Sequence, residues 1–365
     1  MRDPTKARVT QKDVAREAGV SHVTVSLALR GRREIPPATR KRIEAIARRL
    51  GYTPDPMLKA LSAYRQTQRP VAYHSTLAWI NNYPSPDELY RPEGFRLFFE
   101  GAKQRAAELG YGLATVNLAE FNYEKRATQR VLDTRGIKGL LVAPVHSSLG
   151  HVNLDWDRYS AVRMGYSMKD TLLHTVVTSQ YRGGYSATEH LVTLGYRKIA
   201  YIHEEQFNLR TSGHFLGGYL SACAHYDLGG GSVLALPIAG NNREALAWEQ
   251  ARQWIAKEKP DAIIMAAWDL LPLLIHWGYD VPGNIGLASL TVGEKNQSTS
   301  GIHQNERAAG RAAIDVLTSM VERQEAGIPK TPMHVLIEGV WRDGRTTRPQ
   351  VGQAPGPPPA APPLN

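Results

Sequence analysis

The sequence has little of several features that would assign it to a special class of protein. It contains one cysteine, Cys223, among 365 residues, so no disulfide can form within the chain. This favours a reducing compartment such as the cytoplasm. No run of about 18 uncharged apolar residues occurs, and the first ten residues lack the apolar segment of a secretory signal. We therefore expect a cytoplasmic protein with no membrane partner.

Motifs for catalysis and metal binding are also missing. The sequence contains no P-loop, no Gly-x-Ser-x-Gly and no Gly-x-Gly-x-x-Gly. Its 12 histidines include no pair at metal-ligand spacing that has cysteine or carboxylate support. We therefore expect no enzyme, no cofactor and no metal, and we interpret the histidines as structural or surface residues.

The positive charge is concentrated near the N-terminus. The formal net charge is +10, and residues 1–70 hold 16 of the 44 basic and 6 of the 34 acidic side chains. The rest of the chain has 28 of each sign, so these seventy residues account for the whole excess. Such a patch is typical of proteins that bind the phosphate backbone of nucleic acids. The alternative interpretation is a solubilising basic arm.

Residues 9–29 have the pattern of two short helices joined by a tight turn. Thr10 and Asp13 are spaced as a capping box at the start of the first helix. Gly19 suits the left-handed backbone that ends a helix, and Ser21 can cap the second helix. Two short helices around a glycine turn predict a helix-turn-helix.

A third helix is predicted after Pro36 and Pro37, which suit a helix start because the missing N–H costs little there. Its apolar stripe is Ile43, Ile46, Ala47 and Leu50. The opposite face is basic, and it consists of Arg40, Lys41, Arg42, Arg48 and Arg49. These side chains either lie near DNA phosphates or form a solvated face.

One known N-terminal domain, called a headpiece, matches Val9 to about Asp55 without a gap. The match is carried by the runs VTQKDVAREAGVSHVTVSLALRG and TRKRIEAIARRLGYTPD. They resemble the lactose-repressor/galactose-repressor (LacI/GalR) family. The resemblance implies a DNA-binding transcription regulator, taken here as a repressor, with an α/β core. Members bind a near-palindromic operator as a homodimer, and a small-molecule effector such as a carbohydrate modulates them. The sequence lacks the leucine heptads that tetramerise some relatives, so we expect a dimer.

The resemblance also assigns roles to residues of the headpiece. The second helix would lie in the major groove, and the positions that match base readers are His22, Val23 and Leu27. The positions that match phosphate contacts are Thr10, Ser21, Thr24, Ser26 and Arg30. Leu27 departs from the pattern, since many members have an arginine there that can bind guanine through two hydrogen bonds. Operator preference at that base pair should therefore differ.

Residues 55–70 match the hinge helix and linker of the family. In that family the segment folds when two protomers meet over the operator, and a leucine then wedges into the minor groove. Leu61 takes the wedge position when counted from Tyr52 and Pro54. An ordinary amphipathic helix is the alternative, because Leu58, Leu61 and Tyr64 are three residues apart.

After the linker, short apolar segments alternate with helical ones, which predicts parallel sheets covered on both faces. The predicted strands are 75–80, 112–118, 139–145, 161–166, 198–203, 233–238, 261–267, 285–290 and 334–339. The predicted helices are 94–109, 123–134, 184–194, 216–225, 243–257 and 307–323. Residues 300–305 resemble the segment where the family's chain returns to its first subdomain.

The fold class predicted is an α/β core of two Rossmann-like subdomains, similar to periplasmic binding proteins, with an N-terminal all-α helix-turn-helix headpiece. The domain limits are 1–54 for the headpiece, 55–70 for the hinge helix and linker, and 71–345 for the effector-binding and dimerisation core. The proline-rich remainder, 346–365, is predicted to be disordered.

The effector site departs from the family. Phe215 replaces a common arginine, Thr291 a common aspartate, and Trp268 the asparagine of an Asn-Asp pair. The clamp for sugar hydroxyls is therefore mostly absent, and a constitutive DNA-binding regulator that has lost its effector is the alternative. Ligands bind at the carboxyl ends of parallel strands. The pocket candidates on this basis are Asn82, Tyr83, His146, His203, Arg210, Phe215, Trp268, Asp269 and Thr291.

Overall fold

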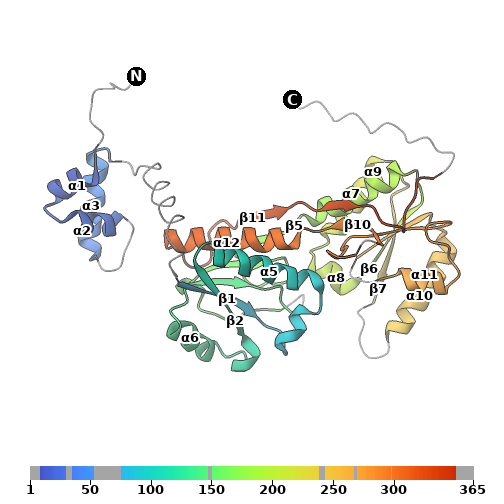
Figure 1. The fold of residues 1–365 in the computed structure, drawn as a ribbon, viewed down its shortest axis with the longest axis horizontal. Helices are drawn as coiled ribbons and strands as arrows, with labels where there is room; N and C mark the ends of the chain where they lie inside the picture. Colours follow the sequence, from blue (N-terminus) through green and yellow to red (C-terminus); the bar gives the residue numbers. More distant parts are fainter. Residues whose placement is uncertain are drawn as a thin grey trace, which may run out of the picture. The chain divides into compact units, whose positions relative to one another are not determined.

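A computed structural model of the chain describes residues 9–29, 35–52, 75–146, 150–237, 243–266, 269–296 and 298–350 (Figure 1). The chain divides into an N-terminal helical unit and an α/β unit, each of which is described by itself. Arg30, Trp268 and the predicted hinge segment 55–70 with Leu61 lie outside the described residues.

The N-terminal unit consists of α1 (Gln11–Ala18), α2 (His22–Leu29) and α3 (Pro37–Arg49). The three predicted helices are confirmed, and α3 begins at a proline as expected. Burial of one apolar face from each helix stabilises the unit. The buried residues are Val14, Ala15, Ala18, Val25, Ala28, Ile35, Ile43 and Ala47.

Local hydrogen bonds set the ends of α1 and α2. Asp13 Oδ2 accepts from the backbone N of Thr10 at 2.9 Å and from its hydroxyl at 2.7 Å. Ser21 Oγ accepts from the backbone N of Thr24 at 3.0 Å. Gly19 has φ of 63°, which is the left-handed conformation that glycine adopts at least cost. The predicted caps and turn of the helix-turn-helix are therefore present.

The α/β unit contains two six-stranded sheets in the described part of the chain. The first has the order β11-β5-β4-β3-β1-β2 and the second β12-β10-β9-β8-β6-β7. Every pair of neighbouring strands is parallel except β10 with β12. We call the halves built on these sheets the first and second subdomains. The two-subdomain α/β fold predicted from the sequence is confirmed.

The strands of the first sheet are β1 (Ser75–Asn81), β2 (Tyr111–Asn117), β3 (Gly139–Val142), β4 (Ser160–Met164), β5 (His174–Thr178) and β11 (His334–Ile337). Those of the second are β6 (Ile199–Glu204), β7 (Ser232–Leu236), β8 (Ala262–Met265), β9 (Gly286–Ser289), β10 (Ser300–His303) and β12 (Val340–Arg342).

Helices cover both faces of each sheet (Figure 1). The first subdomain has α5 (Glu93–Glu108), α6 (Lys125–Thr134) and α12 (Glu306–Arg323), and 3-10 turns at Pro86–Tyr90, Leu118–Phe121 and Trp156–Arg158. The second has α7 (Gln180–Thr193), α8 (Glu205–Arg210), α9 (His214–His225), α10 (Arg243–Glu258) and α11 (Leu271–His276).

Alternation along the buried strands produces two separate cores in the second subdomain. Tyr201 of β6 packs in the core that includes Leu191 of α7 and Cys223 of α9. Its neighbour Ile202 points to the other face, in the core that includes Ala251 of α10 and Leu274 of α11. Strands buried on both faces read as continuous apolar runs, which explains why the sequence predicts them well.

The chain passes between the two sheets three times. The passages are β5 through α7 to β6, β10 through α12 to β11, and the short link between β11 and β12. Residues 300–305 do lead back to the first subdomain, but β10 occupies most of this segment. The strands β5, β10 and β12 were not predicted, because they are short and carry polar residues such as His174, Thr175 and Arg342.

The limit predicted for the proline-rich tail, residue 346, is wrong. Thr346 is 2% exposed, and its hydroxyl donates to Leu287 O at 2.6 Å. Arg348 donates to Gly283 O at 2.6 Å, and the backbone N of Gln350 donates to Leu194 O at 2.7 Å. The core therefore extends at least to Gln350, since these hydrogen bonds fix residues whose composition alone suggests a tail.

Glycines allow α7 and α9 to approach closely. A Cβ added at Gly218 would lie 2.0 Å from the backbone oxygen of Tyr181. One added at the neighbouring Gly217 would lie 3.9 Å from Tyr181 Cδ2, an ordinary contact. Adjacent positions on one helix thus differ in whether a methyl group fits.

We expect Gly218→Ala to lower the free energy of unfolding by about 1–3 kcal/mol, because the two helices must separate. The matched control Gly217→Ala should raise it by about 0.5–1 kcal/mol, because alanine is the better helix former and has room. Equilibrium denaturation of the two variants measures both changes. Equal effects of the two substitutions would show that the close approach of α7 and α9 is not what limits residue 218.

Candidate DNA-binding surface and subdomain boundary

The second helix of the headpiece exposes the first two predicted base readers. His22 and Val23 both lie on the surface of α2, and Val23 is 63% exposed although it is apolar. An exposed valine on a short helix has no partner within the described headpiece core, but it fits apolar contact with a thymine methyl. Leu27 differs, because it is half-buried and packs against the headpiece core.

The predicted phosphate-binding hydroxyls already take part in local hydrogen bonds. The hydroxyls of Ser21 and Thr24 lie 2.8 Å apart, and that of Thr10 donates to Asp13. The hydrogen bonds from Thr10 hold the pKa of the Asp13 carboxyl below its ordinary value. Ser26 is half-buried on α2. Hydroxyls at the start of a helix also lie near its unpaired N–H groups, which attract anions.

The basic face of α3 divides into two kinds of residue. Arg42 donates to Ala18 O at 3.1 Å, and Arg49 forms a 2.5 Å ion pair with Glu17, so both hold α3 to α1. Lys41 and Arg48 are exposed and form no ion pair within the described headpiece. These two side chains are therefore available to phosphates.

Four of the pocket candidates meet at the boundary between the subdomains. Asn82 Oδ1 accepts from the backbone N of His146 at 2.9 Å, and the rings of Tyr83 and His146 pack edge to face with centroids 5.0 Å apart. Arg210, at the end of α8, donates to Val145 O and to His146 O, both at 2.8 Å. The Arg210 guanidinium of the second subdomain thus binds two backbone oxygens in a loop of the first subdomain.

Two aromatic rings complete the surroundings of Arg210. Its Nη2 donates to Tyr83 Oη at 3.3 Å, and its guanidinium lies 5.6 Å from the ring centroid of Phe95. Burial raises the pKa of the Tyr83 hydroxyl, and the Arg210 charge opposes that rise. Arg210 therefore uses hydrogen bonds and a cation–π contact to join the two subdomains.

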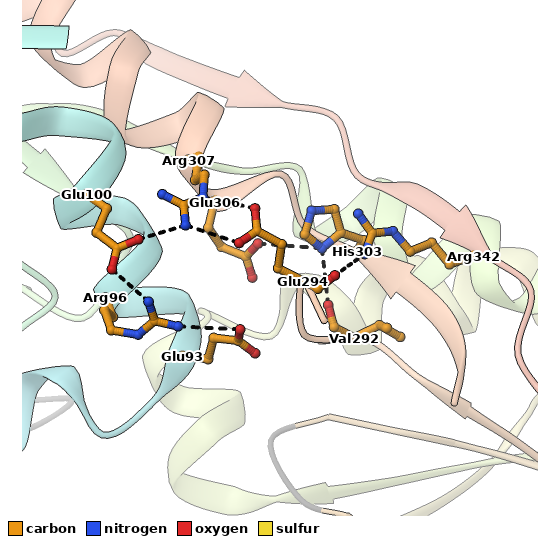
Figure 2. Close-up of polar contacts among 9 residues, drawn as sticks. All are labelled: Glu93, Arg96, Glu100, Val292, Glu294, His303, Glu306, Arg307 and Arg342. Atoms are coloured by element: carbon orange, nitrogen blue, oxygen red, sulfur yellow. Dashed lines mark hydrogen bonds and ion pairs between the residues drawn. The ribbon is translucent and has the colours of Figure 1, made fainter. Parts of the chain in front are cut away.

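A network of charged residues joins the subdomains where α12 begins (Figure 2). Arg307 of α12 contacts Glu294, which follows β9, at 2.9 Å and Glu100 of α5 at 2.7 Å. Arg96 continues the network to Glu100 at 2.6 Å, and Arg342 of β12 donates to Glu294 O at 3.0 Å. Several linked charges hold their geometry better than an isolated surface pair.

Glu306 is a buried acidic residue beside this network. It is 7% exposed, and its carboxylate lies 3.9 Å from His303 Nδ1. Burial raises the pKa of the Glu306 carboxyl, and the charges of Glu93 and Glu294 add to the rise. The region where the chain returns to the first subdomain is therefore tightly packed and charged.

Two other candidates line a cavity of the second subdomain. Asp269 and Thr291 follow β8 and β9, and the cavity that they border has a volume of about 210 Å³. The other lining residues are Met265, Leu270, Leu287, Ala288, Ser289, Asn296 and Thr299. Sequence reasoning missed Ser289, Asn296 and Thr299, although the polar run after β9 could have indicated them.

The remaining described candidates lie in the interior. Phe215 is 2% exposed, and a Cβ added at Gly183 of α7 would be 3.2 Å from its ring. It fills the contact between α7 and α9, so the packing does not favour the pocket role predicted for it. His203 is 4% exposed at the end of β6, and burial lowers the pKa of its imidazole.

Two kinds of feature are absent from the part of the chain that the structure describes. No helix there is both long and apolar enough to cross a membrane. No group of three or more histidine, cysteine, aspartate or glutamate side chains is placed to hold a metal ion there.

Two family models match the chain. Residues 10–55 match that of the bacterial regulatory proteins of the lacI family. Residues 188–347 match that of a periplasmic binding protein-like domain. The first match covers the three helices of the headpiece, and the second covers most of the second subdomain, α12 and β11.

Curated relatives cover nearly the whole chain at low identity. The HTH-type transcriptional repressor PurR of Photobacterium profundum is 26% identical over 330 residues, 86% of this chain and 92% of the relative. The HTH-type transcriptional regulator GntR of Pseudomonas aeruginosa is 26% identical over 88% of this chain and 92% of the relative. The sucrose operon repressor of Escherichia coli is 30% identical over 51% of this chain and 53% of its own length.

Solved structures share the fold. A transcriptional regulator CelR–cellobiose complex aligns over 93% of this chain and 100% of that chain, with a TM-score of 0.55 and 19% identity. A lac repressor dimer bound to operator and an anti-inducer aligns over 94% of this chain and 100% of that chain, with a TM-score of 0.53 and 18% identity. At this identity the likeness concerns the fold alone.

We expect Arg210→Ala to loosen the boundary between the subdomains, because three hydrogen bonds and a ring contact are lost together. Hydrogen bonds from charged donors contribute about 1.5–3 kcal/mol each before compensation, so amide exchange should increase in the residues around Tyr83 and His146. The radius of gyration in solution should also rise. Hydrogen exchange and small-angle scattering measure the two effects.

Arg252→Ala is the matched control, because Arg252 pairs with Glu249 within α10 and touches no other subdomain. It should leave exchange and radius unchanged. If Arg210→Ala behaves like this control, Arg210 does not hold the subdomains together.

Proposed function

Because the chain belongs to the LacI family of bacterial regulatory proteins, we propose that it represses transcription by binding a near-palindromic operator as a homodimer. A small molecule bound at the subdomain boundary would modulate this binding. The observation that carries the proposal is a capped helix-turn-helix with exposed His22 and Val23, joined to a two-subdomain core. The protein would act in the cytoplasm, by binding and not by catalysis.

In this proposal α2 enters the major groove and the segment after the headpiece enters the minor groove. His22, Val23 and Leu27 read bases, while Thr10, Ser21, Thr24, Ser26 and Arg30 hold phosphates. The hydroxyls of Ser21 and Thr24 support this role because they lie at the N-terminus of α2, where anions bind readily. Leu61 is the minor-groove wedge that bends the operator.

The effector class is proposed from relatives. One relative is named a sucrose operon repressor, and one similar structure is a complex with cellobiose. Carbohydrates are therefore the first ligands to test, with Asn82, Tyr83, His146, Asp269 and Thr291 as contacts and Trp268 as a further candidate. A ligand that binds only the native state raises its melting temperature, so a thermal-shift screen is suitable.

A regulator that binds DNA without an effector is the second candidate. Arg210 favours it, because this side chain already joins the subdomains through Val145 and His146. The placement of Phe215 in the core also favours it, since many relatives have a polar clamp at this position. Operator binding that no ligand of the screen changes would support this candidate over the first.

We expect operator binding to fall steeply with salt and the selected site to be two-fold symmetric. Two headpieces bring twice the excess charge, and each neutralised phosphate releases counterions, with a slope of about −0.9 per phosphate in a logarithmic plot. Site selection followed by titrations at several salt concentrations measures both. Asymmetric sites, or affinity that does not depend on salt, would contradict a dimeric headpiece.

We expect Leu27→Arg to change the preferred base at one symmetric pair of positions, because arginine can bind guanine through two hydrogen bonds. Arg48→Gln is the comparison, since an exposed basic residue of α3 should affect all DNA sequences equally and reduce the salt slope by about one. Site selection with each variant distinguishes them. An unchanged base preference in Leu27→Arg would refute our placement of α2 in the groove.

A further inference from the structure

A group of side chains with basic character lies at the subdomain boundary outside the pocket candidates. The ring of Tyr166, after β4, is 4.5 Å from the ring of His214 at the start of α9 and 5.5 Å from that of His334 on β11. In the same loop as Tyr166, Lys169 Nζ donates to Ser212 Oγ at 2.9 Å. The group spans both subdomains, because Lys169 and His334 belong to the first and Ser212 and His214 to the second.

A buried arginine adds to the positive charge of this group. Arg163 of β4 is 5% exposed and donates to Thr175 Oγ1 at 2.8 Å and to Met168 O at 2.5 Å. Neutral oxygens satisfy these donors without cancelling the charge. Within the described residues, no ion pair involves Arg163, Lys169, His214 or His334. Asp170 is the one acidic residue whose charge acts on Arg163, and it is exposed.

Burial and neighbouring charges lower the pKa values of two members of this group. Burial lowers the pKa of the Lys169 ammonium, and the charge of Arg163 lowers it further. Burial also lowers the pKa of the His214 imidazole, with further contributions from His334 and Lys169. Burial and neighbouring positive charge thus both disfavour the protonated forms of Lys169 and His214.

The start of α9 adds further positive charge beside this group. Gly213 precedes the helix with φ of 71°, and His214 is its first residue. A 12-residue helix carries a partial positive charge at its N-terminus, where backbone N–H groups have no intrahelical acceptor. This charge adds to that of the side chains around it.

We propose that Lys169, Ser212, His214 and His334 form a binding site for an oxyanion, the carboxylate or phosphate group of a small metabolite, across the boundary of the two subdomains. Lys169, Ser212 and the imidazoles supply donors, and the buried guanidinium of Arg163 supplies a positive potential behind them. Lys169, Ser212 and His334 are exposed, and His214 is half-buried, so a solute can reach the group.

A bound anion would stabilise one arrangement of the subdomains, because its partners come from both. A ligand shifts an equilibrium only by the difference in its affinity for the two states, and an open arrangement would separate His214 from His334. Its effect on operator binding rests on the proposed function. The anion site itself does not.

The site also predicts how binding depends on pH. The anion binds the protonated imidazole of His214, and the lowered pKa of this group leaves it mostly neutral at neutral pH. Affinity should therefore rise as pH falls. The other titratable or charged groups that face it are Arg163 and Tyr166 of the β4 segment, Lys169, Asp170 and His334, with His174 nearby on β5.

Calorimetric titration of the full chain with sulfate tests the site, with chloride keeping the ionic strength constant. Sulfate stands for a phosphate group and keeps its charge between pH 6 and pH 8. Acetate, titrated separately, stands for a carboxylate. We expect saturable binding of at least one anion, stronger at pH 6 than at pH 8 by about tenfold.

Lys169→Gln and His214→Gln should each weaken the binding about tenfold, since each removes a charge-assisted hydrogen bond. Lys125→Gln is the matched control, because Lys125 is an exposed lysine of α6, away from the boundary. The pH dependence should disappear or become weaker in His214→Gln. Melting temperatures of the three variants without anion show that each is folded.

Three results would overturn the inference: binding that is not saturable, binding that Lys169→Gln and Lys125→Gln weaken equally, or binding that does not vary with pH. Operator titrations without anion keep the two proposals separate. If the chain binds its operator but no anion, only the anion site fails. If it binds the anion but no specific DNA, the proposed function fails.

Discussion

Parallel pairing of the strands is the constraint on which the core depends. In a parallel sheet all strands end at one edge, and here the ends of both sets of strands meet the same boundary. Asn82 and Tyr83 follow β1, and Tyr166 follows β4. Thr291 follows β9 in the second sheet. Residues far apart in sequence therefore come together at the boundary, which explains why polar side chains gather there although apolar runs dominate the strands.

The three passages of the chain between the sheets limit how the boundary can change. The passage that contains α12 is held at its start by Arg307, which pairs with Glu294 and Glu100 (Figure 2). A charged network with several partners resists displacement more than a single exposed pair does. Changes in the angle between the subdomains are thus more easily accommodated away from this network. There the contacts are made by Arg210 and by the group of Lys169, Ser212, His214 and His334, which we call the Lys169 group.

The sequence predicts the architecture well because the architecture depends on periodicity. Apolar runs such as those of β6 and β8 need only local reading, and the capping residues Thr10 and Ser21 act within three residues. The sequence predicts less where the structure of a segment depends on partners that are distant in the chain. β12 pairs with β10 far earlier in the chain, and Thr346 is fixed by Leu287. Neither relation leaves a local pattern.

The candidate site shows the same division. Asn82, Tyr83 and His146 follow strands, so topology brings them to the boundary, whereas Arg210 reaches them from the end of α8. Position in the sequence could not show that Phe215 lies in the core and not in a pocket, because its burial depends on the glycines of α7. The Lys169 group was missed for a related reason. Its members come from a loop, a helix start and an edge strand, and only the fold brings their charges within reach of one another.

The Arg210 contacts and the Lys169 group, which both lie at the boundary, differ in whether they need a ligand. Arg210 finds acceptors in the protein itself, so its contribution is present whenever the subdomains meet. The group of Lys169, Ser212, His214 and His334 touches across the boundary through the Lys169–Ser212 hydrogen bond, and in our proposal it holds the same arrangement more strongly only when an anion binds. A regulator needs two states that differ by a few kcal/mol at most if one ligand is to shift them. A contact that the protein makes by itself, beside one that an anion strengthens, provides such a difference, and the anion-dependent contact is the one that a ligand can control.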